Sequence, residues 1–570
     1  MNTSTKPMPE RRKGLRSDKS ADGPPPAGPL ISDELIAALR ERLTERRIQD
    51  GIRLFEEHAE LLTHFDPTQK NAASLTGALA VWADIGFDRS VRVGEILRRF
   101  TPAVRAQLPI REYMHLRLAE GMVAMADELP DAGIPHFDFV IGVAEELGDR
   151  ESLSIANFWK GRCLRKKGEY DQAMVFTVHG RELAQDLGHP AMAAVMRVLE
   201  SWLLFQKGRA KEAAAILQDA SAVLRHTDDY VTLGNIHSSH GRMARRDGRY
   251  EQAIEHFTRA IEEYKKADPY HRNLARSLAN IALVKRYVAL QLRRKIDAEA
   301  QRRRQAVAKG KPAAAGESAG YRARMEQLRQ EAFAHLEEAA SIYPHHPNYH
   351  GAGTVHLNCG YLHLDNGDFD QAQTECEKAY ALGEEKRDLI LMARARVLQC
   401  MIENGRVDEE IGEGADPGKH ARRAVEVARE AVELARHTQN RRLLALAYVW
   451  QGLSQCCTFF DDYESARQSY EHALALMKGD ETGHVVEGIQ TLKARLARSG
   501  SVDATLRSWS QGALGDKTFQ QITEDFADLI IPKVWEREGR KVSRVAAKLS
   551  ISPKKVRRIL SRTGKAKRNL

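Results

Sequence analysis

The chain has 570 residues and a formal net charge of +9, with 42% hydrophobic and 29% charged residues. This length exceeds what one compact core holds, so it predicts several domains or a repeat array. No run of about 18 apolar residues occurs, so we expect neither a transmembrane helix nor a membrane partner. The polar, basic and Pro-rich N-terminus lacks the apolar stretch of a secretory signal, which favours a cytoplasmic protein.

The positive charge is concentrated near the C-terminus. Residues 540–570 contain 12 Lys and Arg residues and no Asp or Glu. Because the whole chain carries only +9, the first 539 residues together carry −3. Such a local excess indicates a function specific to this segment.

Two regions precede the first recognisable motif. Residues 1–31 contain too few apolar side chains to offset the entropy cost of ordering, so we expect them to be disordered. Residues 32–115 have a helical pattern without a clear repeat, and we interpret them as an N-terminal helical region.

A repeat occupies residues 116–500. In three segments a Gly is followed after seven residues by a second Gly, two later by an aromatic residue, and three later by an Ala. The matching residues are Gly161, Gly168, Tyr170 and Ala173; Gly241, Gly248, Tyr250 and Ala253; and Gly360, Gly367, Phe369 and Ala372. The spacing predicts antiparallel helix pairs: small residues allow close packing, the second Gly ends the first helix, and the pairs stack into a solenoid.

This pattern resembles the tetratricopeptide repeat (TPR) family in a longer-period form, over roughly two-thirds of the chain. The resemblance implies an all-α fold of helical hairpins that binds a protein or peptide on its concave face. A spacer or a dimer scaffold is the alternative for such an array. Insertions near residues 296–320 and 408–420 interrupt the repeat, and we expect loops there, with helical extensions left open.

No candidate for catalysis or cofactor binding stands out in the sequence. The segment GEGADPGKH, residues 412–420, lacks the glycine spacing of a phosphate-binding loop, and His420 stands where Ser or Thr would hold Mg²⁺. Four histidines in residues 343–356 lack partners at metal-ligand spacing. The six cysteines form no CxxC pair, so we expect buried, reduced thiols. We therefore predict a non-enzymatic protein without cofactor or metal.

The C-terminal part divides into a linker at residues 501–516, a small helical domain at 517–564 and a basic tail at 565–570. The first helix of the domain carries apolar residues at helical spacing: Ile522, Phe526, Leu529, Ile530 and Val534. We expect two short helices after it, at residues 542–549 and 553–562, with Ser552 as N-cap and Pro553 as first helical residue. Their predicted shared core consists of Val545, Ala546, Leu549, Ile551, Val556, Ile559 and Leu560.

The two short helices form a helix-turn-helix by pattern, and the domain resembles the Fis-type DNA-binding domain found at the C-terminus of NtrC-class bacterial regulators. The resemblance implies that residues 553–562 are the recognition helix. It assigns duplex DNA contacts to the following residues: Lys541, Arg544, Ser552, Lys554, Lys555, Arg557, Arg558 and Arg562. Ser550 replaces the usual turn glycine, and Pro532 lies inside the helix that carries the family's dimer contact, so a homodimer stays open.

Two functional hypotheses follow. In the first, the protein is a bacterial transcriptional regulator: the repeat array binds a protein or peptide, the C-terminal domain binds DNA, and the protein is nucleoid-associated when bound. In the second, it is a TPR adaptor whose C-terminal helices dimerise or contact protein. A third hypothesis, an RNA-associated scaffold, lacks an aromatic platform for stacked bases.

Overall fold

The computed structural model describes residues 30–85, 90–308, 317–345, 348–409, 417–438, 440–457, 459–477, 483–499 and 517–562. These residues form 26 helices and no strand, which confirms the predicted all-α fold class. The helices are α1 (Asp33–Glu45), α2 (Ile48–Glu57), α3 (Ala59–Thr63), α4 (Ala72–Asp84), α5 (Ser90–Arg99), α6 (Pro102–Gln107), α7 (Ile110–Ala126), α8 (Pro130–Leu147), α9 (Arg150–Lys167), α10 (Tyr170–Asp186), α11 (Pro190–Gln206), α12 (Ala210–Leu224), α13 (Tyr230–Arg246), α14 (Tyr250–Ala267), α15 (Arg272–Ala308), α16 (Ser318–Ile342), α17 (Tyr349–Asn366), α18 (Phe369–Glu385), α19 (Leu389–Glu409), α20 (Pro417–Arg436), α21 (Arg441–Gln455), α22 (Tyr463–Ala475), α23 (His484–Ser499), α25 (Phe519–Arg537), α26 (Val542–Leu549) and α27 (Pro553–Arg562).

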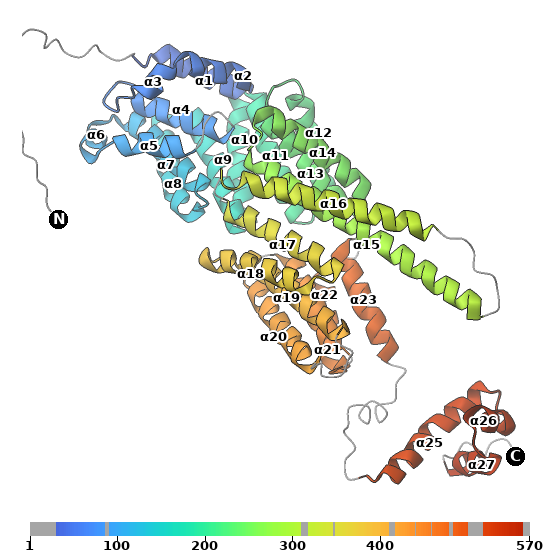
Figure 1. Ribbon diagram of the computed structural model, residues 1–570. Helices are drawn as coiled ribbons and strands as arrows, with labels where there is room; N and C mark the ends of the chain where they lie inside the picture. The colour runs from blue at the N-terminus through green and yellow to red at the C-terminus, as the bar shows by residue number, and fades with distance from the viewer. Residues whose placement is uncertain are drawn as a thin grey trace, which may run out of the picture.

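From α7 to α22 the helices form successive antiparallel pairs, α7 with α8 through α21 with α22, that stack into a solenoid (Figure 1). We call the members of each pair the first and the second helix. First helices also pack on one another: α9 contacts α11, α11 contacts α13, and α13 contacts α15. Each first helix thus contacts the first helix of the neighbouring pair. The row of first helices lines the inner side of the array.

Close packing within each pair depends on the small residues of the repeat. A side chain on Gly161 would lie 3.1 Å from the carbonyl oxygen of Ala173 on the second helix. In the next pair the small residue is Ser201, whose hydroxyl donates a hydrogen bond of 2.8 Å to the carbonyl oxygen of Ala213. The same contact between first helix and second helix thus recurs from pair to pair.

The turn between the two helices of a pair requires a backbone conformation that glycine adopts readily. Gly168, Gly248 and Gly367 have φ values of 87°, 73° and 86°. In this left-handed region a Cβ atom is strained, and the turn satisfies the last carbonyl groups of the first helix. These glycines therefore end α9, α13 and α17 as the repeat predicts.

The aromatic residue of the repeat begins the second helix and connects neighbouring pairs. Tyr170 packs edge-to-face on Trp202 of α11, with ring centroids 5.6 Å apart. Tyr250 contacts Tyr287 of α15 at 5.5 Å. Each ring therefore reaches beyond its own turn to the next first helix, which helps to fix the stacking of successive pairs.

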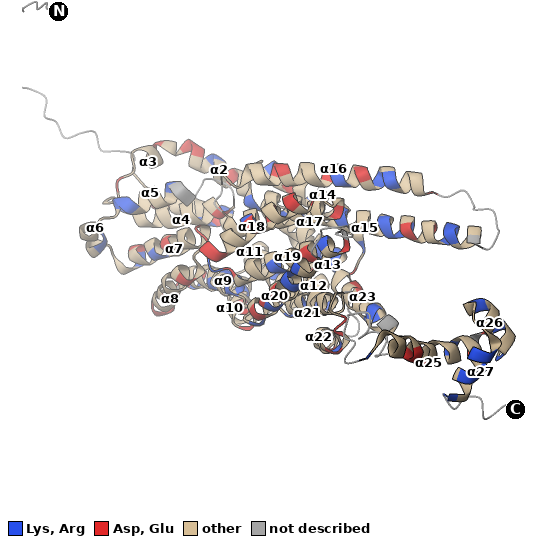
Figure 2. Ribbon diagram, turned by 60° about the horizontal axis from the view of Figure 1, so that its bottom comes forward, with Lys and Arg blue, Asp and Glu red and all other residues tan. Residues whose placement is uncertain are grey.

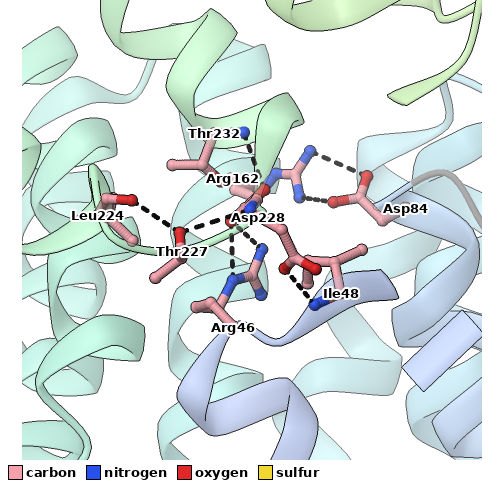
Figure 3. Close-up of polar contacts among 9 residues, drawn as sticks. Arg46, Ile48, Asp84, Arg162, Leu224, Thr227, Asp228 and Thr232 are labelled. Atoms are coloured by element: carbon pink, nitrogen blue, oxygen red, sulfur yellow. Dashed lines mark hydrogen bonds and ion pairs between the residues drawn. The ribbon is translucent and has the colours of Figure 1, made fainter. Parts of the chain in front are cut away.

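The N-terminal helices are anchored to the array by buried charges (Figure 3). Arg46, in the left-handed conformation at the end of α1, donates to Asp229 through Nε at 2.8 Å and Nη2 at 2.5 Å. Both side chains are nearly inaccessible, at 3% and 1% exposure. Asp229 also accepts from the backbone N–H of Thr232 and so caps α13. The neighbouring Asp228 accepts from the backbone N–H of Ile48 at 2.6 Å.

A second anchor joins α4 to the array. The Asp84 carboxylate lies 2.6 Å from Nη1 of Arg162 and 2.8 Å from Nη2 of Arg272. Burial alone would raise the pKa of Asp84, but the two guanidinium groups outweigh it and lower the pKa to about 2. The predicted boundary at residue 116 falls inside α7, so the N-terminal helical region continues into the first helix pair.

Where they are described, the predicted insertions are helical rather than looped. α15 runs for 37 residues to Ala308, and α16 begins at Ser318, so two helical extensions project side by side from the array (Figure 1). The physical reason is composition: Ala, Arg and Gln dominate residues 290–308, and all three favour helix. Residues 309–316 and 410–416 lie outside the described part of the chain.

Several predictions concern residues that the structure does not describe. The linker 501–516, the basic tail 565–570 and most of segment 1–31 lie outside the described residues. Of that first segment, Ile31 is described and is buried in the core. Within the described ranges, no helix is both long and apolar enough to cross a membrane.

Candidate functional site

The C-terminal unit consists of α25, α26 and α27. Thr518 caps α25: its hydroxyl accepts from the backbone N–H of Gln521, and Oε1 of Gln521 accepts from the backbone N–H of Thr518 at 2.8 Å. Pro532 lies inside α25 without ending it. Gly539, with φ of 65°, reverses the chain before α26.

One small core holds the three helices together. It contains Val545 and Ala546 of α26 and Val556, Ile559 and Leu560 of α27, all buried, with Leu549 and Ile551 partly buried against them. From α25 the core receives Ile531 and Trp535. These two were not among the predicted core residues, although Ala527, Ile531 and Trp535 follow one another at intervals of four, a helical stripe that signals a buried face.

The other apolar face of α25 has no partner within the described residues. Phe519 is 85% exposed and Phe526 is 48% exposed. Ile522, Leu529 and Ile530 are only partly buried. The stripe identified in the sequence therefore lies largely outside the core of the C-terminal unit.

The turn between α26 and α27 places the third helix. Ser550 ends α26 in the left-handed conformation, with φ of 52°. Oγ of Ser552 accepts a hydrogen bond of 3.2 Å from the backbone N–H of Lys555 at the start of α27. As acceptor toward the helix, the Ser552 hydroxyl keeps its own hydrogen for an external acceptor.

Six cationic side chains stand out on α26, α27 and the residue before α26. We call them the six-cation surface: Lys541, Arg544, Lys554, Lys555, Arg557 and Arg558. All six are exposed, and their side chains make no ion pair or hydrogen bond with any described residue. Figure 2 shows Lys and Arg on α26 and α27, with Asp and Glu on α25. An exposed surface of this kind can bind phosphate groups without losing internal contacts.

Arg562 differs from the other predicted DNA contacts. Its guanidinium lies 2.6 Å from Asp528 and 3.0 Å from Glu524, both on α25. Hydrogen bonds to Asp528 and then Glu524 raise the pKa of Arg562. Arg562 therefore helps to hold α27 on α25, and its predicted contact with DNA stays a prediction.

The histidine tract in residues 343–356 supports the structure of the array. His350 Nδ1 lies 2.6 Å from Asp388, and His356 Nδ1 lies 2.6 Å from Glu375. Across the described ranges, no group of three or more His, Cys, Asp or Glu side chains is arranged to hold a metal ion. Segment 412–420, which lacks the glycine spacing of a phosphate-binding loop, lies mainly outside the described residues.

All six cysteines are free thiols. Five are buried and Cys359 is partly buried. Burial raises the pKa of Cys163, Cys376 and Cys400 to about 12, so these thiols stay protonated at neutral pH. The adjacent Cys456 and Cys457 follow the end of α21 and belong to different clusters of the core.

Comparison with known proteins finds no match among curated sequences. Among solved structures, the chain is similar to the apo form of the quorum sensor NprR from B. thuringiensis, at 13% identity over 78% of this chain and 98% of that chain, with a TM-score of 0.39. It is also similar to a Rap protein complexed with competence and sporulation factor, at 12% identity over 75% and 100% of the two chains, with a TM-score of 0.46. Yeast Tom70 matches at 12% identity over 84% and 98%, with a TM-score of 0.35.

A family model locates the repeat in the middle of the array. Residues 232–289 match the model described as tetratricopeptide repeat. This segment covers nearly all of α13, all of α14 and the first half of α15. The array is therefore a TPR-like solenoid, as the glycine, aromatic and alanine spacing indicated.

Proposed function

We propose that the chain is a DNA-binding transcriptional regulator: the C-terminal unit is a helix-turn-helix domain of Fis type that binds duplex DNA, and the array binds a protein or peptide. The proposal is of a binding protein, not of an enzyme. The observation that carries it is the six-cation surface, whose exposed charges have no partner among the described residues. They lie on and beside two short helices joined by a tight turn.

The geometry of α27 supports a role in DNA recognition. Val556, Ile559 and Leu560 turn inward, so Lys554, Arg557 and Arg558 lie on the exposed side of the same helix. A helix of ten residues is about 15 Å long and fits the major groove, which is roughly 12 Å wide. Arginine can read guanine there, while Lys541, Arg544 and the Ser552 hydroxyl would hold phosphates.

The array supports the second half of the proposal. Its first helices contact one another in succession from α9 to α21, and they form a continuous inner surface. A surface built from repeated helix pairs suits an extended protein or peptide segment. Binding there would change DNA binding by the C-terminal unit, which is how a regulator of this architecture would respond to a signal.

DNA occupancy in cells tests the regulatory role. The tagged full-length protein should be enriched at discrete genomic sites, and a variant carrying Lys554→Ala, Arg557→Ala and Arg558→Ala should lose this enrichment at equal abundance. A pull-down with the full-length chain should recover a specific protein or peptide. Absence of discrete sites would refute the regulator.

The exposed apolar face of α25 favours a second function, self-association or contact with another protein. Burying Phe519 and Phe526 would remove two large aromatic side chains from water. We expect the full-length chain to sediment as a dimer and Phe526→Glu to sediment as a monomer. Lys533→Glu on the same helix, whose side chain is exposed, controls for charge alone. A chain that is monomeric at all concentrations would refute self-association.

A further inference from the structure

The inner side of the array contains a second set of unpaired cations. Arg165 lies on α9, Arg242 on α13 and Arg276 on α15, so all three belong to first helices. Their side chains are only partly exposed. Within the described part of the chain, no carboxylate lies within 4.0 Å of any of the three guanidinium groups.

Nearby acidic residues are occupied by other cations. Asp84 pairs with Arg162 and Arg272, and Glu128 pairs with Lys166 at 2.8 Å. These two carboxylates therefore neutralise neighbouring cations, and the charges of Arg165, Arg242 and Arg276 are not neutralised by them. We call Arg165, Arg242 and Arg276 the inner arginine cluster.

The hydrogen-bond donors of the cluster are almost unused. Three guanidinium groups carry fifteen N–H donors in all. Among the described residues, one hydrogen bond is accepted from these groups: Nη2 of Arg242 donates to Oγ of Ser239 at 3.0 Å. The Nε atoms of Arg165 and Arg242 are buried without a hydrogen-bond partner. Arg165 instead stacks over the ring of Trp202, 5.1 Å from its centroid, which fixes its position.

Holding these groups together costs free energy in the unliganded protein. Burial, and after it the proximity of Arg276, lowers the pKa of both Arg165 and Arg242. Buried donors without acceptors are rare in folded proteins, because each loses its hydration without compensation. Such an arrangement is typical of a binding site whose ligand supplies the missing acceptors.

We infer that the inner arginine cluster binds the carboxylates of an acidic peptide segment. This inference rests on the proposed peptide-binding function of the array and names the chemistry of its ligand. A guanidinium group and a carboxylate can form two parallel hydrogen bonds, and several carboxylates along an extended peptide can reach cations on several helices.

The charge of the rest of the chain favours a short peptide over a long polyanion. Residues 1–539 carry −3 in total, so the array as a whole offers little long-range attraction to a polyanion such as nucleic acid. A short acidic segment can enter between the first helices and make its contacts there, where water is partly excluded and charge pairs are stronger.

Fluorescence anisotropy with the full-length protein tests the inference. The probes are a labelled hexaglutamate peptide and a labelled hexaglutamine peptide of equal length. We expect hexaglutamate to bind at least tenfold more tightly, and the double variant Arg165→Met, Arg276→Met to lose at least tenfold in affinity. Arg259→Ala on the second helix α14, which removes an exposed arginine paired with Glu255, should bind as the wild type does.

Thermal unfolding separates a ligand site from a structural role. If the cluster is a ligand site, Arg165→Met relieves repulsion and leaves the Tm unchanged or higher while binding is lost. A lower Tm together with normal binding would assign Arg165 to structure and overturn the inference.

Two further outcomes would also overturn it. Equal affinity for the two peptides would show that carboxylates are not recognised. Displacement of hexaglutamate by tripolyphosphate at a lower concentration than by unlabelled hexaglutamate would assign the cluster to phosphate. If a pull-down then recovers a partner without acidic residues, the proposed binding function of the array stands and only this inference fails.

Discussion

Two parts of the molecule gather positive charge, and they do so in opposite ways. The six-cation surface of the C-terminal unit is exposed, and its side chains make no ion pair or hydrogen bond with the part of the chain that the structure describes. The inner arginine cluster is partly buried, and the Nε atoms of two of its members find no acceptor among the described residues. The first set of charges costs the folded protein little, whereas the second set is maintained against desolvation and mutual repulsion.

This difference indicates different partners. Exposed cations bind a polyanion by releasing its counterions, so affinity depends steeply on salt and little on shape. Recessed guanidinium groups exclude part of the solvent and require acceptors in defined positions, so affinity depends on geometry. The contrast agrees with DNA at the C-terminal unit and a short acidic ligand in the array.

The largest expected effect comes from unfolding the helices that carry the six-cation surface. Ala546→Asp places a charge in the core between α26 and α27, where Ala546 is 7% exposed. We expect the C-terminal unit to unfold, at a cost of several kcal/mol, and DNA binding to disappear while the array stays folded. Ala547→Asp, at the exposed neighbouring position, is the matched control. Circular dichroism and anisotropy report folding and binding; normal binding by Ala546→Asp would show that the core is misassigned.

The next largest effect comes from removing positive charge from α27 without unfolding the C-terminal unit. Replacing Lys554, Arg557 and Arg558 with Ala should reduce DNA affinity by at least about 100-fold, at roughly 1 to 3 kcal/mol for each base contact. The log–log salt slope, about −0.9 for each neutralised phosphate, should become less steep. Hexaglutamate binding to the array should not change. Anisotropy across a salt series measures both, and an unchanged slope would show that α27 does not face DNA.

Local patterns predicted much of the C-terminal unit. The capping residue Ser552, Pro553 and the inward spacing of Val556, Ile559 and Leu560 are contained within one short segment, and α26 and α27 have the predicted bounds. The inward face of α25 was not predictable in the same way. Apolar residues occur on more than one face of α25, so the sequence offers several candidates for the buried face. Packing against α26 and α27 buries the face with Ile531 and Trp535.

Contacts between distant residues account for the rest. Arg562 pairs with Asp528, 34 residues away, and nothing in the local sequence distinguishes it from the unpaired Arg558. The array repeat was predicted because its glycines recur at fixed spacing. The inner arginine cluster was not predicted, although the sequence contains a signal for it. Arginines recur 80 residues apart, at Arg162 and Arg242 and again at Arg165 and Arg245, and so occupy the same positions of the repeat. Without knowing which helix face is inner, such arginines resemble solvated charges.

A smaller difference between the array and the C-terminal unit should appear in their stability when the pH is lowered. His115, 5% exposed and hydrogen-bonded to Ser74 and Arg40, has its pKa lowered to about 4 by burial and by Arg40. The unfolded chain takes up a proton near pH 6.5 and the folded chain does not, so stability falls as pH drops from 6.5 toward 4. Between pH 7 and pH 5 we expect a loss of about 2 kcal/mol from His115, at 1.36 kcal/mol per pKa unit.

The C-terminal unit provides the internal comparison for this pH effect, because residues 517–570 contain no histidine. Chemical denaturation at several pH values, followed separately for the array and the C-terminal unit, should show a pH-dependent midpoint only for the array in this range. His115→Gln should reduce the dependence. An array whose midpoint is equal at pH 7 and pH 5 would contradict the prediction.

The smallest expected effect concerns Arg562, which belongs to neither set of unpaired cations. Because Arg562 forms solvent-exposed ion pairs with Asp528 and Glu524 of α25, its removal should change the stability of the C-terminal unit only slightly. Arg562→Ala should change the salt slope of DNA binding by less than one unit, whereas Arg557→Ala, on the six-cation surface, should change it by about one unit. The Asp528→Asn variant sharpens the test, because it frees part of the Arg562 charge and should make the slope slightly steeper. Equal slope changes for Arg562→Ala and Arg557→Ala would show that the ion pair opens when DNA binds, and that pairing within the folded chain does not determine which cations reach the phosphates.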